Sequence, residues 1–293
     1  MIKYTLIDDA VMSLGGTSLT LDAITEPFKD ECELISSASL CKTHLQFKHP
    51  KVWIIGNTLG LNKESYETLI EILQTKRTVK IDFDYGFCKY RGPTPHRILG
   101  KKECDCINNP ETLSLKNIYT LIHSNCSSIF YMSEQQRQIH KNFFPVSDEK
   151  SLVLSSCFTS SSLSKMRELR NMEKNEKYAI IQGHPGWHSQ AKGVSESVNY
   201  ALQNNLNYDI ISTKTHDEML EKLGSYKGLI FLPIIEDTCP RITIEAKLMG
   251  LEVITNDNSQ HTKESWWSSS IDEIESYLAE RPNILHQQIS NLN

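Results

Sequence analysis

Acidic and basic residues follow an apolar run at residues 231–246, FLPIIEDTCPRITIEA. The run GLIFLPI is typical of a buried strand, and Pro240 followed by the apolar-periodic ITIEAKLMG indicates a helix. The start of such a helix presents unpaired N–H groups and the positive end of the helix dipole, which together can seat a phosphate. Glu236 and Asp237 precede this helix and Glu245 lies within it. Carboxylates on either side of a phosphate can accept hydrogen bonds from sugar hydroxyls, so the segment suits a nucleotide-sugar.

The same segment resembles the carboxylate–x7–Glu signature of retaining glycosyltransferases with the GT-B fold, those of family 4 and its relatives. Asp237 and Glu245 have the required separation. The family usually has Glu at the first position, and Glu236 is the alternative residue for it. The resemblance implies that Asp237 binds the donor sugar and that Glu245 binds the ribose. The other interpretation of the segment is a solvated loop before an ordinary surface helix.

A second motif of the family, G-R-x(n)-K-G, is partly present after the predicted strand KYAII. Lys192 and Gly193 match its second half, whereas the Arg is absent and Gln182 or His184 stands near its place. In the family the two cations hold the donor diphosphate, so the resemblance implies that role for Lys192, with Arg241 in place of the missing Arg. The alternative for Lys192 is an exposed lysine at a helix start, which the helix dipole disfavours.

Two further loops follow predicted strands. Thr215 and His216 come after YDIIS, and by analogy with the family this loop borders the nucleotide base. Gly16 and Thr17 come after the first strand, where the Gly-Gly pair lets the backbone approach a ligand closely. The resemblance places them beside the donor diphosphate; a tight turn between a strand and a helix is the alternative.

The segment IDFDYGFCKYR, residues 81–91, resembles an "HDY…C…R" segment found in a subset of these enzymes, including phage-encoded ones. Asp84 would orient an acceptor hydroxyl, with Tyr85 and Arg91 beside it. The alternative is a salt-bridged loop that only braces the domain.

The resemblance therefore implies a specific set of site residues. The implied catalytic residues are Asp84, Lys192, Asp237 and Glu245. The implied donor-binding residues are Gly16, Thr17, Gly183, His184, Lys192, Thr215, His216, Glu236, Asp237, Thr238, Cys239, Pro240, Arg241, Ile242 and Glu245. The implied acceptor-side residues are Tyr85 and Arg91.

Composition limits the other possibilities. The net charge of −5 over 293 residues does not indicate a broad nucleic-acid surface. The sequence contains no apolar run of about 18 residues, so no membrane span is expected. The N-terminus is typical of a core strand rather than a signal peptide, and the eight scattered cysteines then indicate free thiols in a reducing cytoplasm. Cys88, Cys104, Cys106 and Cys126 match no common zinc spacing, so we expect no metal site.

Strands and helices alternate along the chain, which predicts an α/β protein with parallel sheets and helices on both faces. The resemblance implies the GT-B arrangement, in which two Rossmann-like, doubly wound domains face each other across a cleft. We expect an acceptor-side domain at residues 1–147 and a donor-binding domain at 148–270. The helix within residues 271–293, broken near Pro282, is expected to return to the first domain.

Together with these features, the resemblance implies a metal-independent, retaining glycosyltransferase without a cofactor. Its donor would be a nucleotide-sugar, with UDP favoured because such donors are common. Its acceptor would be a hydroxyl of a glycan, a lipid-linked sugar or a nucleic acid. Two alternatives remain open: a non-catalytic nucleotide-sugar-binding module on the same scaffold, and a Rossmann-like oxidoreductase, for which Gly-Gly-Thr alone supplies no dinucleotide fingerprint.

Overall fold

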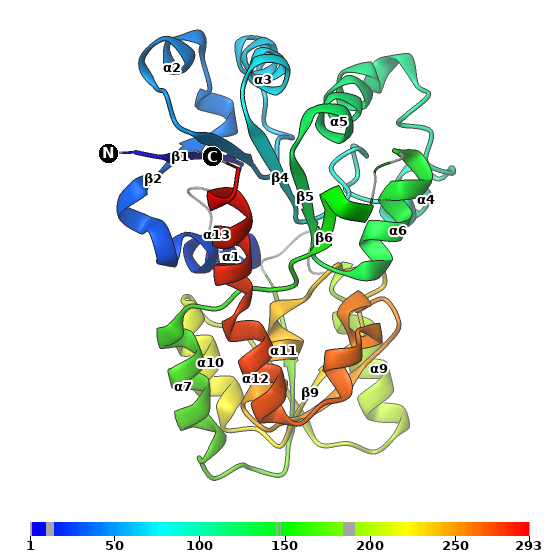
Figure 1. The fold of residues 1–293 in the computed structure, drawn as a ribbon. Helices are drawn as coiled ribbons and strands as arrows, with labels where there is room; N and C mark the ends of the chain where they lie inside the picture. The colour runs from blue at the N-terminus through cyan, green and yellow to red at the C-terminus, as the bar shows by residue number, and fades with distance from the viewer. Residues whose placement is uncertain (1, 10–14, 145, 147, 184–190, 293) are drawn as a thin grey trace. The chain divides into compact units, whose positions relative to one another are not determined.

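The computed structural model describes residues 2–9, 15–144, 146, 148–183 and 191–292 of the chain. The chain divides into two compact units (Figure 1). Unit 1 consists of Met1–Cys157 together with Glu280–Asn293, and unit 2 consists of Phe158–Ala279. Among the described residues, no helix is long and apolar enough to cross a membrane.

Unit 1 is built on a six-stranded, fully parallel sheet in the order β2-β1-β3-β4-β5-β6. Its strands are β1 (Tyr4–Asp8), β2 (Cys32–Ser36), β3 (Val52–Ile55), β4 (Thr78–Asp82), β5 (Ser128–Tyr131) and β6 (Ser151–Val153). β1, β3, β4 and β5 are buried along their whole length. This is the pattern of a parallel sheet whose two faces are both covered, and it explains why these strands are nearly continuous apolar runs.

The helices of unit 1 lie between its successive strands, except the last one, which follows unit 2 in the sequence. They are α1 (Gly16–Thr25), α2 (Lys42–Phe47), α3 (Lys63–Thr75), α4 (Pro93–Gly100), α5 (Leu113–Asn125), α6 (Glu134–Phe143) and α13 (Arg281–Ser290). Short 3-10 helices occupy Glu26–Glu31, Ser37–Ser39, Pro110–Thr112 and Asp148–Lys150. The last helix, α13, packs against α1 at the other end of the sequence (Figure 1).

Unit 2 contains a four-stranded parallel sheet in the order β10-β9-β7-β8. Its strands are β7 (Tyr178–Ile181), β8 (Tyr208–Ile211), β9 (Gly228–Phe231) and β10 (Glu252–Thr255). Its helices are α7 (Ser160–Arg170), α9 (Val194–Gln203), α10 (His216–Gly224), α11 (Arg241–Leu248) and α12 (Ile271–Ala279), with 3-10 turns at Gln260–Lys263 and Ser265–Ser268.

The two sheets share one strand order. In each, the first strand lies between the second and the third, and the fourth follows the third. Connections from the first strand therefore run in opposite directions, which opens a crevice beyond the carboxyl ends of the first and third strands. That position falls between β1 and β3 in unit 1 and between β7 and β9 in unit 2. The prediction of two doubly wound parallel sheets is confirmed.

Some local features differ from the expectation. His96, Arg97, Lys101 and Lys102 give the segment after Gly92 the composition of a basic, solvated loop. Residues 93–100 nevertheless form the helix α4, which begins at Pro93, where proline is tolerated. The strand β6 lies beyond the expected domain boundary at residue 147, yet it pairs with β5 in the sheet of unit 1. At the start of α6, Ser133 caps the helix by accepting a hydrogen bond from the Gln136 N–H, and the Gln136 side chain accepts a hydrogen bond from Met132 N.

Candidate functional site

In unit 2, the loops after β7 and β9 touch each other at the carboxyl edge of the sheet. Ile234 N donates to Ala191 O at 3.1 Å. Gly193 has φ +69°, and a Cβ on it would lie 1.7 Å from the carbonyl oxygen of Leu232. Only glycine permits this approach of two backbones. These contacts hold the Lys192-Gly193 motif beside the loop that contains Glu236 and Asp237.

Lys192 and Asp237 meet at this junction. The Lys192 ammonium pairs with Asp237 Oδ2 and also lies 5.7 Å from the centre of the Phe231 ring. The Asp237 backbone is anchored, because its N–H donates to Asn258 O at 2.8 Å and its carbonyl accepts from Gln260 N at 3.0 Å. The Lys192 side chain is 46% exposed, so its charge is both held in place and open to a ligand.

Glu245 lies at the centre of a buried charge cluster in α11. Its side chain is 2% exposed, and Oε1 accepts hydrogen bonds from His216 Nε2 at 2.9 Å and from Arg241 Nε at 3.2 Å. Burial opposes ionisation, but the hydrogen bond from His216 and the charge of Arg241 outweigh it and hold the pKa of Glu245 below its ordinary value. Both of these hydrogen bonds end on the same oxygen, Oε1. Glu245 is therefore an ionised acceptor with one oxygen already oriented.

The two basic partners of Glu245 are positioned by their own elements. His216 is the first residue of α10, which Thr215 caps by accepting from Glu218 N at 3.2 Å. Arg241 is the first residue of α11, and its guanidinium carbon lies 4.0 Å from the centre of the Phe158 ring. Arg241 is buried, and its Nε atom donates a hydrogen bond to Glu245 within the same helix.

The other predicted donor-side residues lie along the same edge. Glu236, Thr238, Cys239 and Pro240 belong to the loop after β9, and Ile242 is in the first turn of α11. Thr238 and Pro240 are buried, whereas Glu236, Cys239 and Ile242 are half-buried.

The loop after β7 is only partly described. Gly183 is exposed, and a Cβ on it would meet no atom within 4 Å. His184 lies outside the described residues, as do Trp187 and His188.

In unit 1, the predicted Gly-Gly loop forms the start of α1. Gly16 is the first residue of the helix and is exposed, and Thr17 beside it is half-buried. The loop follows β1, next to the crevice between β1 and β3. The geometry places Gly16 and Thr17 at the edge of the sheet where a doubly wound fold binds ligands.

Asp84 and Arg91 form an ion pair after β4, with Arg91 Nη1 3.1 Å from Asp84 Oδ2. Burial raises the pKa of Asp84 to about 6. Its Oδ1 atom is buried and has no hydrogen-bond partner within the described ranges. The neighbouring Tyr85 is 1% exposed, and its ring stacks on His140 with ring centres 5.5 Å apart, so the ring is packed in the core of unit 1 directly after Asp84.

A buried polar network beneath Asp84 was not predicted. Lys80 Nζ lies 3.1 Å from Asp82 Oδ1, which also accepts from Tyr119 OH at 2.9 Å, and His140 Nδ1 lies 3.3 Å from Asp82 Oδ2. Burial opposes ionisation of Asp82, but the charge of Lys80 outweighs it and lowers the pKa of Asp82, whereas burial lowers the pKa of His140 to about 4. The sequence feature that could have indicated this network is Lys80, a charged residue inside the apolar strand TVKID, because a buried charge requires a partner.

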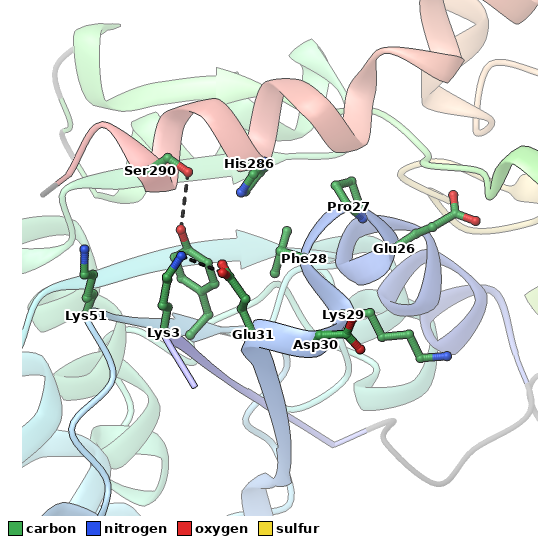
Figure 2. A pocket seen from close by; sticks show the side chains of 11 residues that line it. Lys3, Glu26, Pro27, Phe28, Lys29, Asp30, Glu31, Lys51, His286 and Ser290 are labelled. Carbon is green, nitrogen blue, oxygen red and sulfur yellow. Dashed lines mark hydrogen bonds and ion pairs between the residues drawn. The ribbon is translucent and has the colours of Figure 1, made fainter. Parts of the chain in front are cut away.

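Unit 1 also has a pocket of about 590 Å³, away from all the predicted site residues. It lies between the start of the chain, the 3-10 helix Glu26–Glu31 and α13 (Figure 2). Phe28 and His286 stack with ring centres 5.1 Å apart, and Lys3 pairs with Glu31. The Lys3–Glu31 pair and the hydrogen-bond distance between Tyr4 OH and Ser290 Oγ, 3.3 Å, indicate that the pocket marks the seam where α13 closes unit 1.

Comparison with known proteins gives a likeness in structure alone. No protein-family model matches the chain, and no curated protein matches it in sequence. The catalytic domain of starch synthase IV from Arabidopsis thaliana, bound to ADP and acarbose, superimposes with a TM-score of 0.61 at 8% identity, over 99% of both chains. Sucrose-phosphate synthase from Thermosynechococcus elongatus gives 0.58 at 10% identity, over 99% of this chain and 94% of that one.

A third structure belongs to a different class of enzyme. UDP-GlcNAc 2-epimerase from Methanocaldococcus jannaschii, in complex with UDP-GlcNAc and UDP, gives a TM-score of 0.56 at 9% identity, over 99% of this chain and all of that one. At these identities the comparisons identify the fold. With its two parallel sheets of the same strand order, the chain has the GT-B fold.

Proposed function

We propose that this protein transfers a glycosyl group from a nucleotide-diphosphate sugar to an acceptor hydroxyl. The observation that carries the proposal is the pair of charge clusters at the switch point of unit 2, Lys192 with Asp237 and Glu245 with His216 and Arg241. The likeness to a starch synthase domain bound to ADP and to sucrose-phosphate synthase supports it. We favour a UDP-linked donor, retention of configuration and a transfer step that needs no metal ion.

In this mechanism the leaving group is a nucleoside diphosphate whose negative charge must be stabilised. Lys192 would supply a cation, and the loop before α11 would supply backbone N–H groups, so that the diphosphate replaces Asp237 as the partner of Lys192. Asp237 would then accept a hydrogen bond from the donor sugar. Cleavage of the anomeric C–O bond leaves the electron pair on the diphosphate. The acceptor oxygen forms the new bond on the same face of the sugar, and its proton passes to the departing diphosphate.

Glu245 would bind the ribose through Oε2, because Oε1 is already held by two side chains. Beside the contact with the diphosphate that the resemblance implies, Arg241 would hold Glu245 in place. Its contact with Glu245 makes it a positioning residue for the ribose acceptor, and Lys192 remains a cation for the diphosphate. The remaining donor-side residues would contact the ligand from the same edge of the sheet.

Asp84 is the proposed acceptor-side acid in unit 1. With a pKa raised to about 6, it lies close to the range in which a carboxylate exchanges protons near neutral pH. Arg91 would orient it. We propose a glycan, a lipid-linked sugar or a nucleic acid as the source of the acceptor hydroxyl. We propose a reducing cytoplasm as the compartment, since none of the eight cysteines forms a disulfide.

The first test is binding. Thermal unfolding of the full chain is measured with UDP, ADP and GDP, and UDP is expected to raise the melting temperature most, because a ligand that binds only the folded state stabilises it. Lys192→Ala is expected to weaken UDP binding about 10- to 100-fold, the usual cost of a lost charged hydrogen bond. Lys165→Ala is the control, because Lys165 is an ion-paired lysine of unit 2 outside the site.

The second test is turnover. With UDP-glucose and water as the default acceptor, NMR is expected to show slow release of glucose that first appears as the α anomer. Release as the β anomer would contradict retention. Conversion of UDP-GlcNAc into an epimer would indicate the epimerase class instead. Binding of UDP without any turnover would favour the non-catalytic module, and the absence of nucleotide binding would overturn the proposal.

A further inference from the structure

Three cysteines and a histidine of unit 1 converge on one point. Cys88, His96, Cys104 and Cys106 each direct one ligand atom to it, and these atoms all lie within 4.8 Å of one another. Cys88, His96 and Cys106 are fully buried, and Cys104 is half-buried. The spacing is C-x7-H-x7-C-x-C, so the four residues come from three separate parts of the segment between β4 and α5.

The distances match those of a tetrahedral zinc site. The sulfur atoms of Cys88 and Cys106 are 3.9 Å apart, and each lies 3.4 Å from His96 Nδ1. Zinc binds Cys sulfur at about 2.3 Å and His nitrogen at about 2.0–2.1 Å, so a tetrahedron requires separations of about 3.8 Å between sulfurs and about 3.6 Å between sulfur and nitrogen. An ion therefore fits among these atoms with little movement of the side chains.

The orientation of His96 gives independent support. Its Nδ1 faces the sulfurs, and its Nε2 lies 3.7 Å from Asp105 Oδ1. Both Nε2 and Asp105 Oδ1 are buried without a hydrogen-bond partner within the described ranges. A histidine that binds a metal through one nitrogen usually directs the other to a carboxylate or a carbonyl. Asp105 itself is held by Lys102, whose Nζ lies 2.7 Å from Oδ2.

The segment around these residues needs a cross-link. Residues 83–112 contain only one α-helix, the eight-residue α4, among long irregular stretches. Non-glycine residues adopt a left-handed backbone at Arg91 (φ 61°) and Lys101 (φ 54°), which costs energy. Long irregular loops in compact domains are uncommon unless something orders them. A metal ion bound by residues from both ends of α4 would do so.

We propose that Cys88, His96, Cys104 and Cys106 bind one Zn²⁺ ion that ties the β4–α5 segment of unit 1 together. Four protein ligands fill a tetrahedral coordination sphere, so the ion is structural and takes no part in glycosyl transfer. The sequence did not predict this site, because the Cys104-x-Cys106 spacing is unusual for zinc. His96 also lies in a segment with the composition of a basic loop, which gives no indication of a metal ligand. Sequence spacing alone predicted no metal site.

The test uses the full chain, produced without a histidine tag and purified under reducing conditions without chelator. Elemental analysis is expected to find about one zinc per chain. After removal of the zinc, titration with Co²⁺ is expected to give a sulfur-to-cobalt charge-transfer band in the near ultraviolet and the visible bands of a tetrahedral ion. A reduced chain that holds no zinc and gives no such bands would overturn the proposal, as would a Cys88–Cys106 disulfide that leaves no Co²⁺ binding after reduction.

Matched variants assign the ligands. Cys104→Ser should weaken Co²⁺ binding by about 100-fold or more, because the loss of even a supporting residue around a metal typically costs 10- to 100-fold. Cys32→Ser is the control, since Cys32 is equally half-buried but lies outside the cluster, and it should bind as the wild type does. Equal binding by both variants would remove Cys104 from the site. If Cys104→Ser does not fold, the wild-type spectrum still decides between thiolate ligation and none.

Discussion

At the scale of single residues, the two charge clusters of unit 2 differ in what holds them. Lys192 and Asp237 form a pair that water reaches, so a diphosphate can exchange partners with it at little cost. Glu245 is buried with two basic side chains, and removing one member of such a cluster leaves an uncompensated charge. The Lys192–Asp237 pair therefore suits the binding and release of a diphosphate, whereas the Glu245 cluster suits a part of the site that stays fixed.

His261 is a histidine of unit 2 that lies next to α11, the helix that carries Glu245. It is fully buried, its Nε2 lies 3.1 Å from Thr243 Oγ1 in the first turn of α11, and its ring stacks on Trp266 with centres 5.9 Å apart. Burial lowers the pKa of His261 to about 3, against a smaller opposing effect of the Asp237 charge. The histidine is thus neutral in the folded protein over the range in which an unfolded chain takes up a proton.

The stability of unit 2 is therefore predicted to fall as the pH decreases. Between about pH 6.5 and 3 the unfolded state binds one more proton at this residue than the folded state does, so His261 contributes a loss of about 1.4 kcal/mol per pH unit. Denaturant unfolding at pH 7, 6, 5 and 4 measures the slope. His261→Gln is expected to flatten it, whereas the same change at the exposed His49 should not. The same slope in wild type and His261→Gln would contradict the assignment.

The sequence predicted the site residues that follow strands, because the position after a parallel strand is a local property. It did not predict the residues that meet from distant segments. Lys80 and His140 are 60 positions apart in the sequence, yet both lie beside Asp82. His96 reaches its three cysteines only because α4 forms where a loop was expected. No spacing rule along the chain carries that information.

At the scale of elements, strands such as β1, β7, β8 and β9 were predicted, because each is a short apolar run between polar turns. The helices α2 and α4 were missed because they are short, with six and eight residues. α4 also begins with Pro93 and contains Pro95, and both prolines favour a loop interpretation although they are compatible with the first helical turn. The pairing of β6 with β5 depends on contacts between strands that are distant in the sequence. The composition of the segment before β6 therefore could not show that the boundary between the units lies after this strand.

The contact between the loops after β7 and β9 gives a prediction at this scale. Gly193→Ala would force a Cβ against the Leu232 carbonyl and strain a left-handed backbone, so we expect a loss of at least about 2–3 kcal/mol of stability together with weaker UDP binding. Gly183→Ala has open space and should be near neutral. Gly250→Ala has a left-handed backbone (φ +75°) but no close backbone neighbour, so it should cost only about 1 kcal/mol.

Urea unfolding ranks these three variants, and calorimetric titration with UDP shows whether binding follows the same order. A Gly193→Ala protein as stable as Gly183→Ala would mean that the two loops are not locked together. Weaker UDP binding in Gly250→Ala, at the far end of α11, would contradict a site at the carboxyl edge of the sheet.

At the scale of the whole molecule, the chain builds the same strand order twice without a visible sequence repeat. Only the pattern of apolar strands and their connections is shared, which is what the doubly wound fold requires. The last part of the chain is divided between the units: α12 belongs to unit 2, and α13 to unit 1. Pro282 lies in the first turn of α13, a position where proline is tolerated. Because a proline is unfavourable in the interior of a helix, α12 ends before it and α13 begins as a separate helix.

The closing helix is predicted to stabilise unit 1 specifically. Leu285 is fully buried on α13, which packs against α1 and the 3-10 helix Glu26–Glu31. Leu285→Ala should cost about 2–5 kcal/mol, the usual range for a buried leucine. Hydrogen exchange should then accelerate in α1 and in β1, while β7 and β9 of unit 2 keep their protection. Leu202→Ala is the control, because Leu202 is 61% exposed on a helix of unit 2 and its loss should change neither.

The outcome also bears on the proposed site, because α1 carries Gly16 and Thr17 at its first turn. If α13 holds α1 in place, Leu285→Ala should loosen the Gly-Gly loop without touching any residue of the Lys192 or Glu245 clusters. Faster exchange confined to unit 2 would contradict the assignment of α13 to unit 1. Unchanged exchange throughout would mean that the aromatic contact between Phe28 and His286 is sufficient to hold the helix.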